Sequence, residues 1–287
     1  LRSSAKMRQI PKPMSRSLKR AAAVIGATGG ALFVGGAVVF RSRNASQLQQ
    51  HEFKLEGKTY VVTGGTSGIG KAVVKQLVQN GAHVIVGARD SRRRARLAAD
   101  LDADAKVSFE STGCARTGRA SILALDLADA SSVAVFAREV ETICSSLDGL
   151  VNNAAVIECA DTRTAGGLEM TFATNALGPF HLTNCLLPLL LKGHQTTRAR
   201  VLNVGSRLES KGWVDPALLL ESGLMFQAPS TAQSSASAMI VYASSKLCNS
   251  LLSQELHRRL VHSQQPVDVL CVSPGMVDTG LWRQYPL

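Results

Sequence analysis

Paired cysteines at a spacing suited to a metal ion or a disulfide framework are missing from this chain of 287 residues. Its six cysteines include no C-x-x-C pair and no cluster of the kind that holds zinc. Several stand in apolar runs, where a thiol behaves as a small hydrophobic group. We therefore expect no metal ion and no disulfide framework, and a reducing compartment is mildly favoured. The six are Cys114, Cys144, Cys159, Cys185, Cys248 and Cys271.

Acidic residues are absent from residues 1–51, which hold nine basic ones. The formal net charge of the whole chain is +11, but residues 52–287 carry 23 basic and 21 acidic residues, a net charge of +2. Nucleic-acid binding usually requires a basic surface on the folded domain. The nearly neutral main part therefore argues against nucleic acid as a partner. The excess belongs to the N-terminal segment, which opens with a basic leader over residues 1–20.

Charge of either sign is lacking from residues 21–40, AAAVIGATGGALFVGGAVVF. About 20 apolar residues are enough to cross the hydrocarbon core of a bilayer as a helix. Lys19 and Arg20 precede the run and Arg41 follows it. We expect a transmembrane or signal-anchor helix over 21–40 and a linker over 41–51. A targeting segment that is removed from the mature protein is the alternative.

The membrane that this helix would enter is open to two interpretations. Seven basic residues precede the run and two follow it closely, so the positive-inside rule keeps the N-terminus in the cytosol and sends the main domain across. An acid-free leader rich in Ser and Arg also fits an organelle transit peptide. Anchoring in the endoplasmic reticulum is the favoured prediction, with the mitochondrion or plastid as the alternative.

Short apolar runs alternate with helical patterns from about residue 52 onward. This alternation predicts a doubly wound parallel sheet in one α/β domain over residues 52–287. Residues 104–120, rich in Gly, Ser and Thr, are expected to form a surface loop, and residues 207–238 a partly helical lid beside the substrate. The expected strands are 59–63, 83–88, 121–125, 149–151, 200–204 and 268–272, and the expected helices lie near 69–79, 91–101, 130–146, 168–191 and 243–262.

The first expected strand runs into a glycine-rich turn, VVTGGTSGIG, over residues 61–70. Gly64 permits a tight turn, Gly68 lets a phosphate approach the backbone, and Gly70 lets the next helix pack closely on the strand. The unpaired N–H groups at the start of that helix suit a pyrophosphate. The turn therefore predicts a dinucleotide site. The similar VIGATGG over residues 24–30 does not, because no amphipathic helix follows it.

Arg89 stands at the tip of the second expected strand, where an NAD site usually has a carboxylate for the ribose 2′-OH. An arginine there accommodates a 2′-phosphate instead. NADP(H) is therefore preferred over NAD(H), although a register slip of one residue would place Asp90 at the tip. Arg92, Arg93 and Arg94 are interpreted as a solvated basic face of the next helix.

Polar residues also follow the third and fourth expected strands. Asp126 can hold an adenine amino group or cap the next helix, although Asp129 is better placed as the cap. Small residues in Asn152-Asn153-Ala154-Ala155 let the backbone approach a cofactor, while an Asn amide ties neighbouring strands together. A simple turn is the alternative for this segment.

Ser206, Tyr242 and Lys246 form the strongest constellation in the sequence. Tyr242 and Lys246 share one helix face at i and i+4, and Ser206 ends an apolar run typical of a strand. A neighbouring ammonium is expected to lower the pKa of the phenol from about 10, so that Tyr242 exchanges a proton with a carbonyl or alcohol oxygen. The Ser206 hydroxyl would polarise that oxygen. A plain helix surface is the alternative for the Y-x-x-x-K pair.

Two further segments bear on the site. Asn175 is expected in mid-helix, where it holds a water in a proton path or, alternatively, lies buried at a kink. Ser273, Pro274 and Gly275 leave the sixth expected strand in a rigid turn at the carboxyl edge of the sheet, where ligands bind in this architecture.

In this order the residues resemble the short-chain dehydrogenase/reductase family over about 52–283. The stretches ARD, LTNCLLPLLL, YASSKLCNSLLSQEL and SPGMVDTG are similar to retinol dehydrogenase-like, membrane-anchored NADP(H) members. The resemblance implies a Rossmann-type fold, preceded by the apolar helix, and a catalytic tetrad of Asn175, Ser206, Tyr242 and Lys246. It implies cofactor contacts from Gly64, Thr66, Ser67, Gly68, Ile69, Gly70, Arg89, Asp126, Leu127, Asn153, Ala154, Tyr242, Lys246, Pro274, Gly275, Val277 and Thr279.

Three features depart from the family pattern. Ala155 replaces the last Gly of N-N-A-G, and the 36-residue step from Ser206 to Tyr242 exceeds the family's common spacing. The chain also stops at Leu287, where family members continue through a helical substrate segment and a final strand. The domain is therefore expected to be C-terminally incomplete, with an individual lid.

The function that the resemblance implies is interconversion of a carbonyl and an alcohol on a small lipophilic substrate (retinal-like, aldehyde or ketone), with NADPH as hydride donor. Tyr242 is the expected proton donor. A homodimer and membrane attachment through residues 21–40 are further expectations. A catalytically weak NADP(H)-binding scaffold or sensor is the main alternative, and an enzyme acting on a nucleotide-sugar or acyl-thioester carbonyl is a third reading.

Overall fold

The computed structural model describes residues 54–112, 118–158, 162–193, 198–215, 235–275, 277 and 280–282. The chain divides into two units, Leu1–Val38 and Val39–Leu287, and every described residue belongs to the second. The expected leader (1–20), apolar helix (21–40) and linker (41–51) therefore lie outside the described residues. Within the described ranges, no helix has both the length and the apolar character needed to span a membrane.

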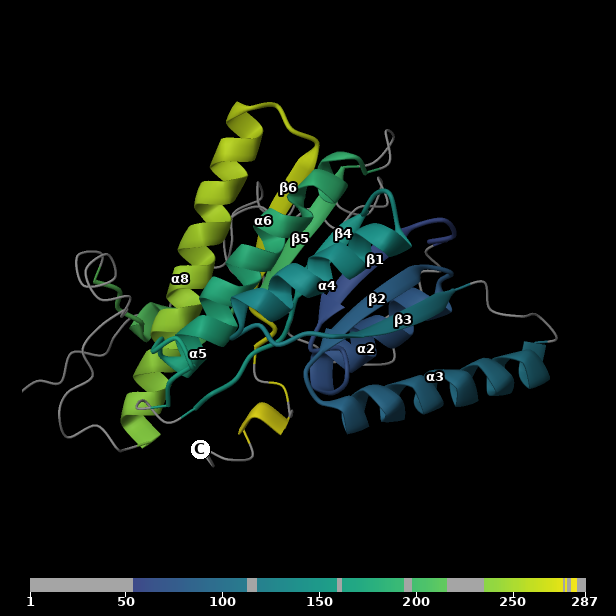
Figure 1. The fold of residues 1–287 in the computed structure, drawn as a ribbon, viewed down its shortest axis with the longest axis horizontal. Helices are drawn as coiled ribbons and strands as arrows, with labels where there is room; N and C mark the ends of the chain where they lie inside the picture. The colour runs from purple at the N-terminus through teal and green to yellow at the C-terminus, as the bar shows by residue number, and fades with distance from the viewer. Residues whose placement is uncertain are drawn as a thin grey trace, which may run out of the picture. The chain divides into compact units, whose positions relative to one another are not determined.

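Six parallel strands form one sheet in the order β3-β2-β1-β4-β5-β6 (Figure 1). β1 lies in the middle, with Val61 opposite Ile85 of β2 on one side and Leu150 of β4 on the other. The strand order reverses beside β1, and ligands bind outside the carboxyl ends of the strands at such a reversal. The strands are β1 (Thr59–Thr63), β2 (His83–Ala88), β3 (Arg119–Ala124), β4 (Gly149–Asn152), β5 (Ala199–Val204) and β6 (Val267–Val272).

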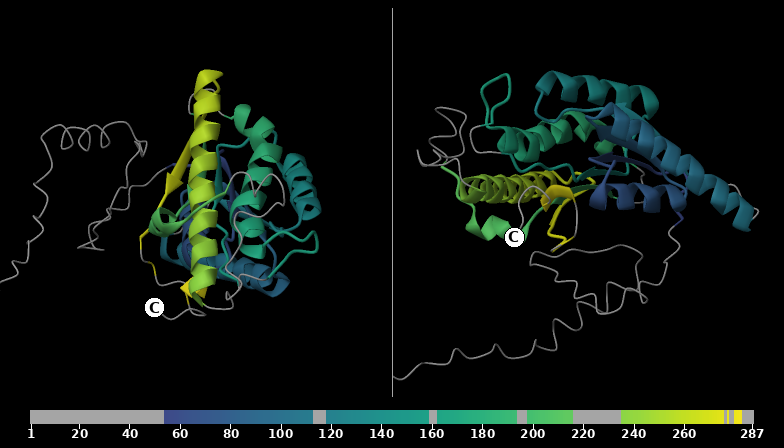
Figure 2. Two further views of the ribbon diagram at one scale, coloured as in Figure 1. Left: turned by 90° about the vertical axis from the view of Figure 1, so that its left-hand side faces the viewer. Right: turned by 90° about the horizontal axis from the view of Figure 1, so that it is seen from below.

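Helices cover both faces of the sheet (Figure 2). One core packs Phe136, Leu186 and Leu260, from α4, α6 and α8, against one face, and a second core packs Val74 and Leu97, from α2 and α3, against the other. The doubly wound sheet is therefore confirmed, and the strand ends differ from the prediction by two residues at most. The helices are α2 (Gly68–Gln79), α3 (Ser91–Thr112), α4 (Ala130–Ile143), α5 (Met170–Phe172), α6 (Gly178–Leu191) and α8 (Ser235–His262).

The predicted surface loop over residues 104–120 is wrong in its extent. α3 continues to Thr112 and β3 begins at Arg119. Lys75 of α2 forms an ion pair with Asp104 of α3, with 2.8 Å between Nζ and Oδ2. The helix therefore extends well beyond residue 101, where the sequence pattern predicted its end.

The single helix predicted over 168–191 is divided into three parts. α5 is followed by a π-helical turn, η2 (Ala173–Leu177), and then by α6. A π turn inserts one extra residue into a helix and often marks a functional site. Asn175 lies in the middle of η2 and is buried there.

α8 begins at Ser235, two turns earlier than predicted, so Tyr242 lies well inside the helix. Of the expected lid over 207–238, the structure describes η3 (Arg207–Lys211) and the start of α8. Residues 216–234 lie outside the described residues.

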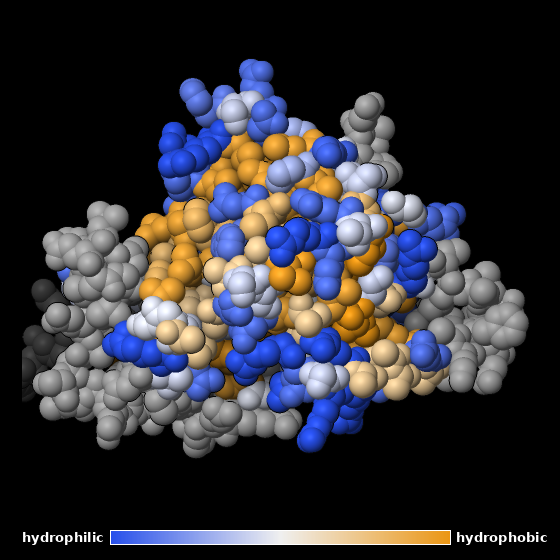
Figure 3. Space-filling view, in the orientation of Figure 1, coloured by the Kyte–Doolittle hydropathy of each residue, from blue (hydrophilic) through white to orange (hydrophobic). Residues whose placement is uncertain are grey.

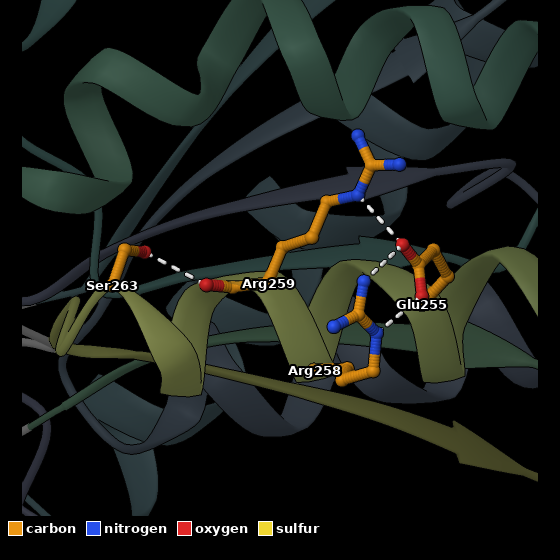
Figure 4. Close-up of polar contacts among 4 residues, drawn as sticks. All are labelled: Glu255, Arg258, Arg259 and Ser263. Carbon is orange, nitrogen blue, oxygen red and sulfur yellow. Dashed lines mark hydrogen bonds and ion pairs between the residues drawn. The ribbon is translucent and has the colours of Figure 1, made fainter.

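The face that α6 and α8 turn toward the viewer carries hydrophobic patches among hydrophilic ones (Figure 3). Phe180 of α6 and Leu251 of α8 are 40% and 50% exposed. Near the end of α8, Glu255 accepts hydrogen bonds from the side chains of Arg258 and Arg259 at 2.7 Å (Figure 4). Exposed ion pairs of this kind contribute little to stability, so they serve mainly to solvate the end of the helix.

Candidate active site

The glycine-rich turn joins β1 to α2 at the carboxyl end of the sheet. Gly64 and Gly68 have φ angles of +66° and +52°, a region that side chains rarely adopt. A Cβ on Gly70 would collide with the Asn153 amide and lie 2.5 Å from the Gly64 carbonyl oxygen. Ser67 is the N-cap of α2, and the first turn of this helix holds no acidic residue. The open backbone and the helix N-terminus together fit a pyrophosphate.

Thr63, the last residue of β1, links this turn to the segment after β4. Its Oγ1 accepts hydrogen bonds from the backbone N–H groups of Asn153 (3.0 Å) and Ala154 (3.1 Å). The Asn153 side chain donates to the carbonyl oxygens of Thr63 (3.0 Å) and Gly64 (3.2 Å). Sequence reasoning missed Thr63, although a hydroxyl directly after two buried valines and before the glycine-rich turn is a usable signal.

Asn152 performs the strand-tying role expected of this segment. Its Nδ2 donates to Asn203 Oδ1 of β5 at 2.8 Å and to Thr183 Oγ1 of α6 at 3.0 Å. The two neighbouring asparagines therefore serve different ends, because Asn153 supports the glycine turn while Asn152 joins β4 to β5.

Arg89 is the first residue after β2, and its side chain is 66% exposed at the strand tip. The Asp90 carboxylate instead accepts a hydrogen bond from the backbone N–H of Arg93 at 2.7 Å, at the start of α3. That hydrogen bond is the main cause that lowers the pKa of Asp90. Arg89 Nη1 lies 3.9 Å from Asp126 Oδ2, at the tip of the next strand. The guanidinium thus occupies the position expected to select the cofactor.

Arg94 departs from the solvated helix face predicted for it. Its Nη1 donates to the carbonyl oxygens of Ala88 (3.0 Å) and Arg89 (3.3 Å). The Arg94 side chain therefore supports the backbone at the tip of β2. Arg92 and Arg93 are exposed, as expected.

Asp126 and Leu127 lie between β3 and α4. Asp129 caps α4, because its Oδ1 accepts from the Ser131 N–H at 2.8 Å. Asp126 Oδ1 accepts from the Ala128 N–H at 3.0 Å within the loop, while its Oδ2 faces Arg89. Asp129, rather than Asp126, therefore caps α4. One oxygen of Asp126 remains at the strand tip.

Ser206, Tyr242 and Lys246 meet between the end of β5 and α8. Ser206 is the N-cap of η3, and its hydroxyl forms a hydrogen bond with Tyr242. Tyr242 and Lys246 are 3% and 2% exposed. Lys246 Nζ lies over the Tyr242 ring, 5.7 Å from its centre, and donates to the Val204 carbonyl oxygen at 2.7 Å. The structure brings the three side chains into one cluster.

Burial dominates the pKa values in this cluster. It raises the pKa of the Tyr242 phenol, and the hydrogen bond with Ser206 offsets part of that rise. It lowers the pKa of Lys246 from 10.5 to about 8, while Cys271 and Glu209 act in the opposite sense. The predicted lowering of the Tyr242 pKa is therefore wrong for this structure, because desolvation of the phenol outweighs the effect of a cation 5.7 Å from the ring.

Asn175 is 1% exposed and joins three parts of the site. Its Oδ1 accepts from the Val156 N–H at 2.8 Å, and its Nδ2 donates to the Val156 carbonyl oxygen at 2.9 Å. Nδ2 also donates to Ser245 Oγ at 3.1 Å. The amide thus connects η2, the loop after β4 and the turn of α8 next to Lys246.

The turn after β6 completes the edge of the sheet. Ser273 Oγ is buried and finds no hydrogen-bond partner within the described ranges. Pro274 follows it, and Gly275 has a φ of +79°. A buried hydroxyl of this kind fits a polar ligand group such as a carboxamide. Val277 is 36% exposed, and the expected contact from Thr279 lies outside the described residues.

Apolar side chains from four parts of the chain surround Tyr242. They come from the loop after β4, from η3, from α8 and from η4 (Gly280–Trp282). A substrate oxygen held at the phenol would therefore have hydrocarbon neighbours. The cluster consists of Ile157, Ala238 and Tyr242, with Leu208, Met239 and Leu281 packed against it.

The family model for short chain dehydrogenase matches residues 58–217. The chain belongs to the short-chain dehydrogenase family. It is 36% identical to retinol dehydrogenase 14 of Mus musculus over 264 residues, 92% of this chain and 74% of that protein. It is 35% identical to polyprenol dehydrogenase of Mus musculus over 228 residues, 79% of this chain and 62% of that protein. The predicted resemblance is confirmed, and the chain is an NAD(P)-dependent oxidoreductase that acts on CH–OH groups.

Solved structures of similar fold support the same conclusion. The NADP active-site complex of RhlG from Pseudomonas aeruginosa has a TM-score of 0.59 and 26% identity, and the match covers 81% of this chain and 78% of that one. An uncharacterised protein from Mycobacterium Paratuberculosis has a TM-score of 0.62 and 31% identity, over 80% and 72% of the two chains. The glycine turn and the buried Ser273 hydroxyl fit a nicotinamide dinucleotide.

Proposed function

We propose that this short-chain dehydrogenase uses NADPH to interconvert a carbonyl and an alcohol on a small lipophilic molecule (retinal-like, aldehyde or ketone). The observation that carries the proposal is the cluster of Ser206 with the buried Tyr242 and Lys246 at the carboxyl edge of the sheet, with apolar side chains packed around the phenol. Similarity to proteins named retinol dehydrogenase and polyprenol dehydrogenase supports a lipophilic substrate.

The bound nicotinamide supplies or accepts a hydride. In the reductive direction, Tyr242 Oη donates its proton to the substrate oxygen, and the Ser206 hydroxyl donates a hydrogen bond to the same oxygen. The raised pKa of Tyr242 keeps the phenol protonated at neutral pH, which suits proton donation. The Lys246 ammonium over the ring stabilises the phenolate that remains.

Asn175 acts in this scheme as a positioning residue. Its amide fixes the backbone of Val156 and the hydroxyl of Ser245, which is next to Lys246 on α8. We also propose that Asn175 holds a water molecule in a proton path, as the sequence suggests.

The proposed cofactor contacts follow the edge of the sheet. Arg89 receives the 2′-phosphate of NADP(H), and one oxygen of Asp126 binds the adenine amino group. Asn153 and Ala154 approach the cofactor through the backbone that Thr63 holds. The remaining contacts are Gly64, Thr66, Ser67, Gly68, Ile69 and Gly70 to the phosphates, Leu127 beside the adenine, and Tyr242, Lys246, Pro274, Gly275, Val277 and Thr279 at the nicotinamide end.

Attachment to the endoplasmic reticulum membrane through residues 21–40 and formation of a homodimer belong to the same proposal. The apolar run supports the first, and the exposed Phe180 of α6 and Leu251 of α8 support the second. We expect the full chain to sediment with membranes after carbonate extraction. We expect Phe180→Glu to lower the sedimentation coefficient in detergent, whereas an unchanged coefficient would remove the dimer from the proposal.

Tyr242→Phe tests the catalytic role directly. It removes the proton donor while keeping the ring, so kcat with NADPH and retinal or a medium-chain aldehyde should fall by about 10³-fold. The dissociation constant of NADPH should change little. The matched control is Tyr60→Phe in β1, which makes the same chemical change away from the cluster and should leave kcat unaltered.

Retention of kcat in Tyr242→Phe would overturn the proposed role of the phenol. Binding of NADPH without turnover by the unaltered full chain, across retinal, aldehydes and ketones, would instead support the scaffold alternative.

A further inference from the structure

Arg94 is a basic side chain at the carboxyl edge of the sheet that the scheme above does not use. It lies in the first turn of α3 and is half-buried, whereas Arg92 and Arg93 before it are exposed. The Cα–Cβ bonds of a helix tilt toward its N-terminus. A long side chain in the first turn can therefore reach back past the start of the helix, toward the strand that precedes it.

Arginines at this place disfavour the helix that carries them. The positive end of the helix dipole lies at the N-terminus, so a cation in the first turn is repelled. The first turn of α3 holds Arg92, Arg93 and Arg94 and no acidic residue. Asp90, just before the helix, offsets part of this repulsion, because its Oδ1 accepts from the Arg93 N–H at 2.7 Å. A residue that conflicts with its own element is expected where it serves another purpose.

The Arg94 guanidinium bonds to the backbone at the tip of β2. Its Nη1 donates to the Ala88 carbonyl oxygen at 3.0 Å and to the Arg89 carbonyl oxygen at 3.3 Å. These two carbonyls belong to the peptide units on either side of the Arg89 Cα. A planar cation with several N–H groups suits two neighbouring acceptors. Arg94 therefore holds the backbone of Arg89 from both sides.

The same strand tip is held by two other parts of the cofactor edge. The Ala88 carbonyl oxygen also accepts from the Leu125 N–H at 3.2 Å, just after β3. The Gly87 carbonyl oxygen accepts from the Gly64 N–H at 2.9 Å, in the glycine-rich turn. Of these three donors, Arg94 reaches furthest along the chain, to Arg89 itself.

The Arg89 side chain is only weakly held by its own contacts. It is 66% exposed, and its Nη1 lies 3.9 Å from Asp126 Oδ2. An exposed ion pair at this distance contributes little order. The direction of the Arg89 guanidinium therefore depends on the backbone that carries it, which Arg94 fixes.

We propose that Arg94 is a positioning residue for the choice of cofactor. Its two hydrogen bonds hold the Arg89 backbone so that the Arg89 guanidinium meets the 2′-phosphate of NADPH. This inference rests on the proposed function, because Arg94 has this role only if Arg89 receives that phosphate. NADH lacks the 2′-phosphate, so its binding should depend little on Arg94.

A double-mutant cycle on cofactor binding tests whether Arg94 acts through Arg89. In the full chain, Arg94→Gln should raise the dissociation constant of NADPH by about three- to tenfold. The dissociation constant of NADH should change by less than about twofold, which also shows that the site is folded. In an Arg89→Ala background, Arg94→Gln should change NADPH binding by less than about twofold, because the group that it positions is gone. Fluorescence titration measures each value.

Arg93→Gln is the matched control, because it removes the same charge from an exposed neighbouring position. It should change both dissociation constants by less than about twofold. An equal rise in Arg93→Gln and Arg94→Gln would indicate a general effect of charge and overturn the proposal. An undiminished effect of Arg94→Gln in the Arg89→Ala background would overturn it too.

Hydrogen exchange tests the contact without any cofactor. In Arg94→Gln, the Leu125 amide that donates to the Ala88 carbonyl oxygen should exchange at least about threefold faster, because the strand tip loses a support. Arg93→Gln should match the unaltered chain. Unchanged exchange at Leu125 in Arg94→Gln would overturn the proposal.

The two levels of the account fail in different ways. If Arg89→Ala leaves NADPH binding unaltered, the cofactor preference in the proposed function fails, and the role of Arg94 with it. If Arg89→Ala weakens NADPH binding but Arg94→Gln does not, only the role of Arg94 is overturned.

Discussion

At the scale of a single residue, the buried Lys246 ammonium lowers the free energy of unfolding while it serves the proposed reaction. It is 2% exposed, and burial lowers its pKa from 10.5 to about 8. Between these pH values the unfolded chain binds more protons than the folded one, so the free energy of unfolding rises with pH through this window and is reduced below it. The reduction is on the order of 3 kcal/mol. The active site therefore retains a charged group at a cost in stability.

Lys246→Met should separate the two effects. At pH 7 the variant should be at least as stable as the unaltered chain, because the loss of a buried charge offsets the loss of the Val204 hydrogen bond. Its kcat should fall by about 10²-fold or more. Urea unfolding and kcat check both outcomes, with Lys192→Met at an exposed position as the control. A large drop in the urea midpoint would contradict this account.

Arg89 should set the choice of cofactor through its position at the tip of β2. In Arg89→Ala, the dissociation constant of NADPH should rise by about ten- to a hundredfold, because a charge-assisted contact to the 2′-phosphate is lost. The dissociation constant of NADH should change little, and Arg92→Ala on the exposed start of α3 should change neither. Fluorescence titration measures all four values. Equal weakening of both cofactors would show that Arg89 has no selective role.

At the scale of the element, the π turn η2 connects the loop after β4 to α8 through Asn175. Asn175→Ala removes the hydrogen bonds to both backbone groups of Val156 and one of the two hydrogen bonds of the Ser245 hydroxyl, which still donates to the Tyr242 carbonyl oxygen. The free energy of unfolding should therefore fall by about 2–4 kcal/mol. Thr174→Ala is the control, because among the described residues the Thr174 hydroxyl makes only a 3.9 Å contact with Met170 Sδ. Urea unfolding at constant m-value measures both. Equal losses of unfolding free energy in the two variants would show that the Asn175 hydrogen bonds do not stabilise the π turn.

Element ends could be predicted from the sequence only where the chain itself marks them. The strand 59–63 was found to the residue because it is a short apolar run that ends in glycines. α3 was predicted too short because the sequence shows no regular apolar spacing after Leu101, although the helix continues to Thr112. α8 was predicted to begin too late because the burial of Ala238 and Val241, which stabilises its first turns, depends on distant segments.

At the scale of the whole molecule, the strand order places the predicted residues at one edge. The turn after β1, the tips of β2 and β3, and the ends of β4, β5 and β6 are all carboxyl ends of parallel strands. Motif order therefore carried information about position in space. Motif order gave no information about how deeply each side chain is buried. The burial that raises the pKa of Tyr242 depends on contacts with Ile157 and Leu208, which are far from Tyr242 in sequence.

Hydride transfer from NADPH to a lipophilic carbonyl is the central claim, and isotope transfer measures it most directly. The full chain is incubated with retinal or a medium-chain aldehyde and NADPH that carries deuterium at both positions of nicotinamide C4, and the alcohol is analysed by mass spectrometry. The account predicts one deuterium on the carbinol carbon, and no labelled alcohol from Tyr242→Phe over the same time. Tight NADPH binding with no labelled alcohol from any lipophilic carbonyl would contradict it.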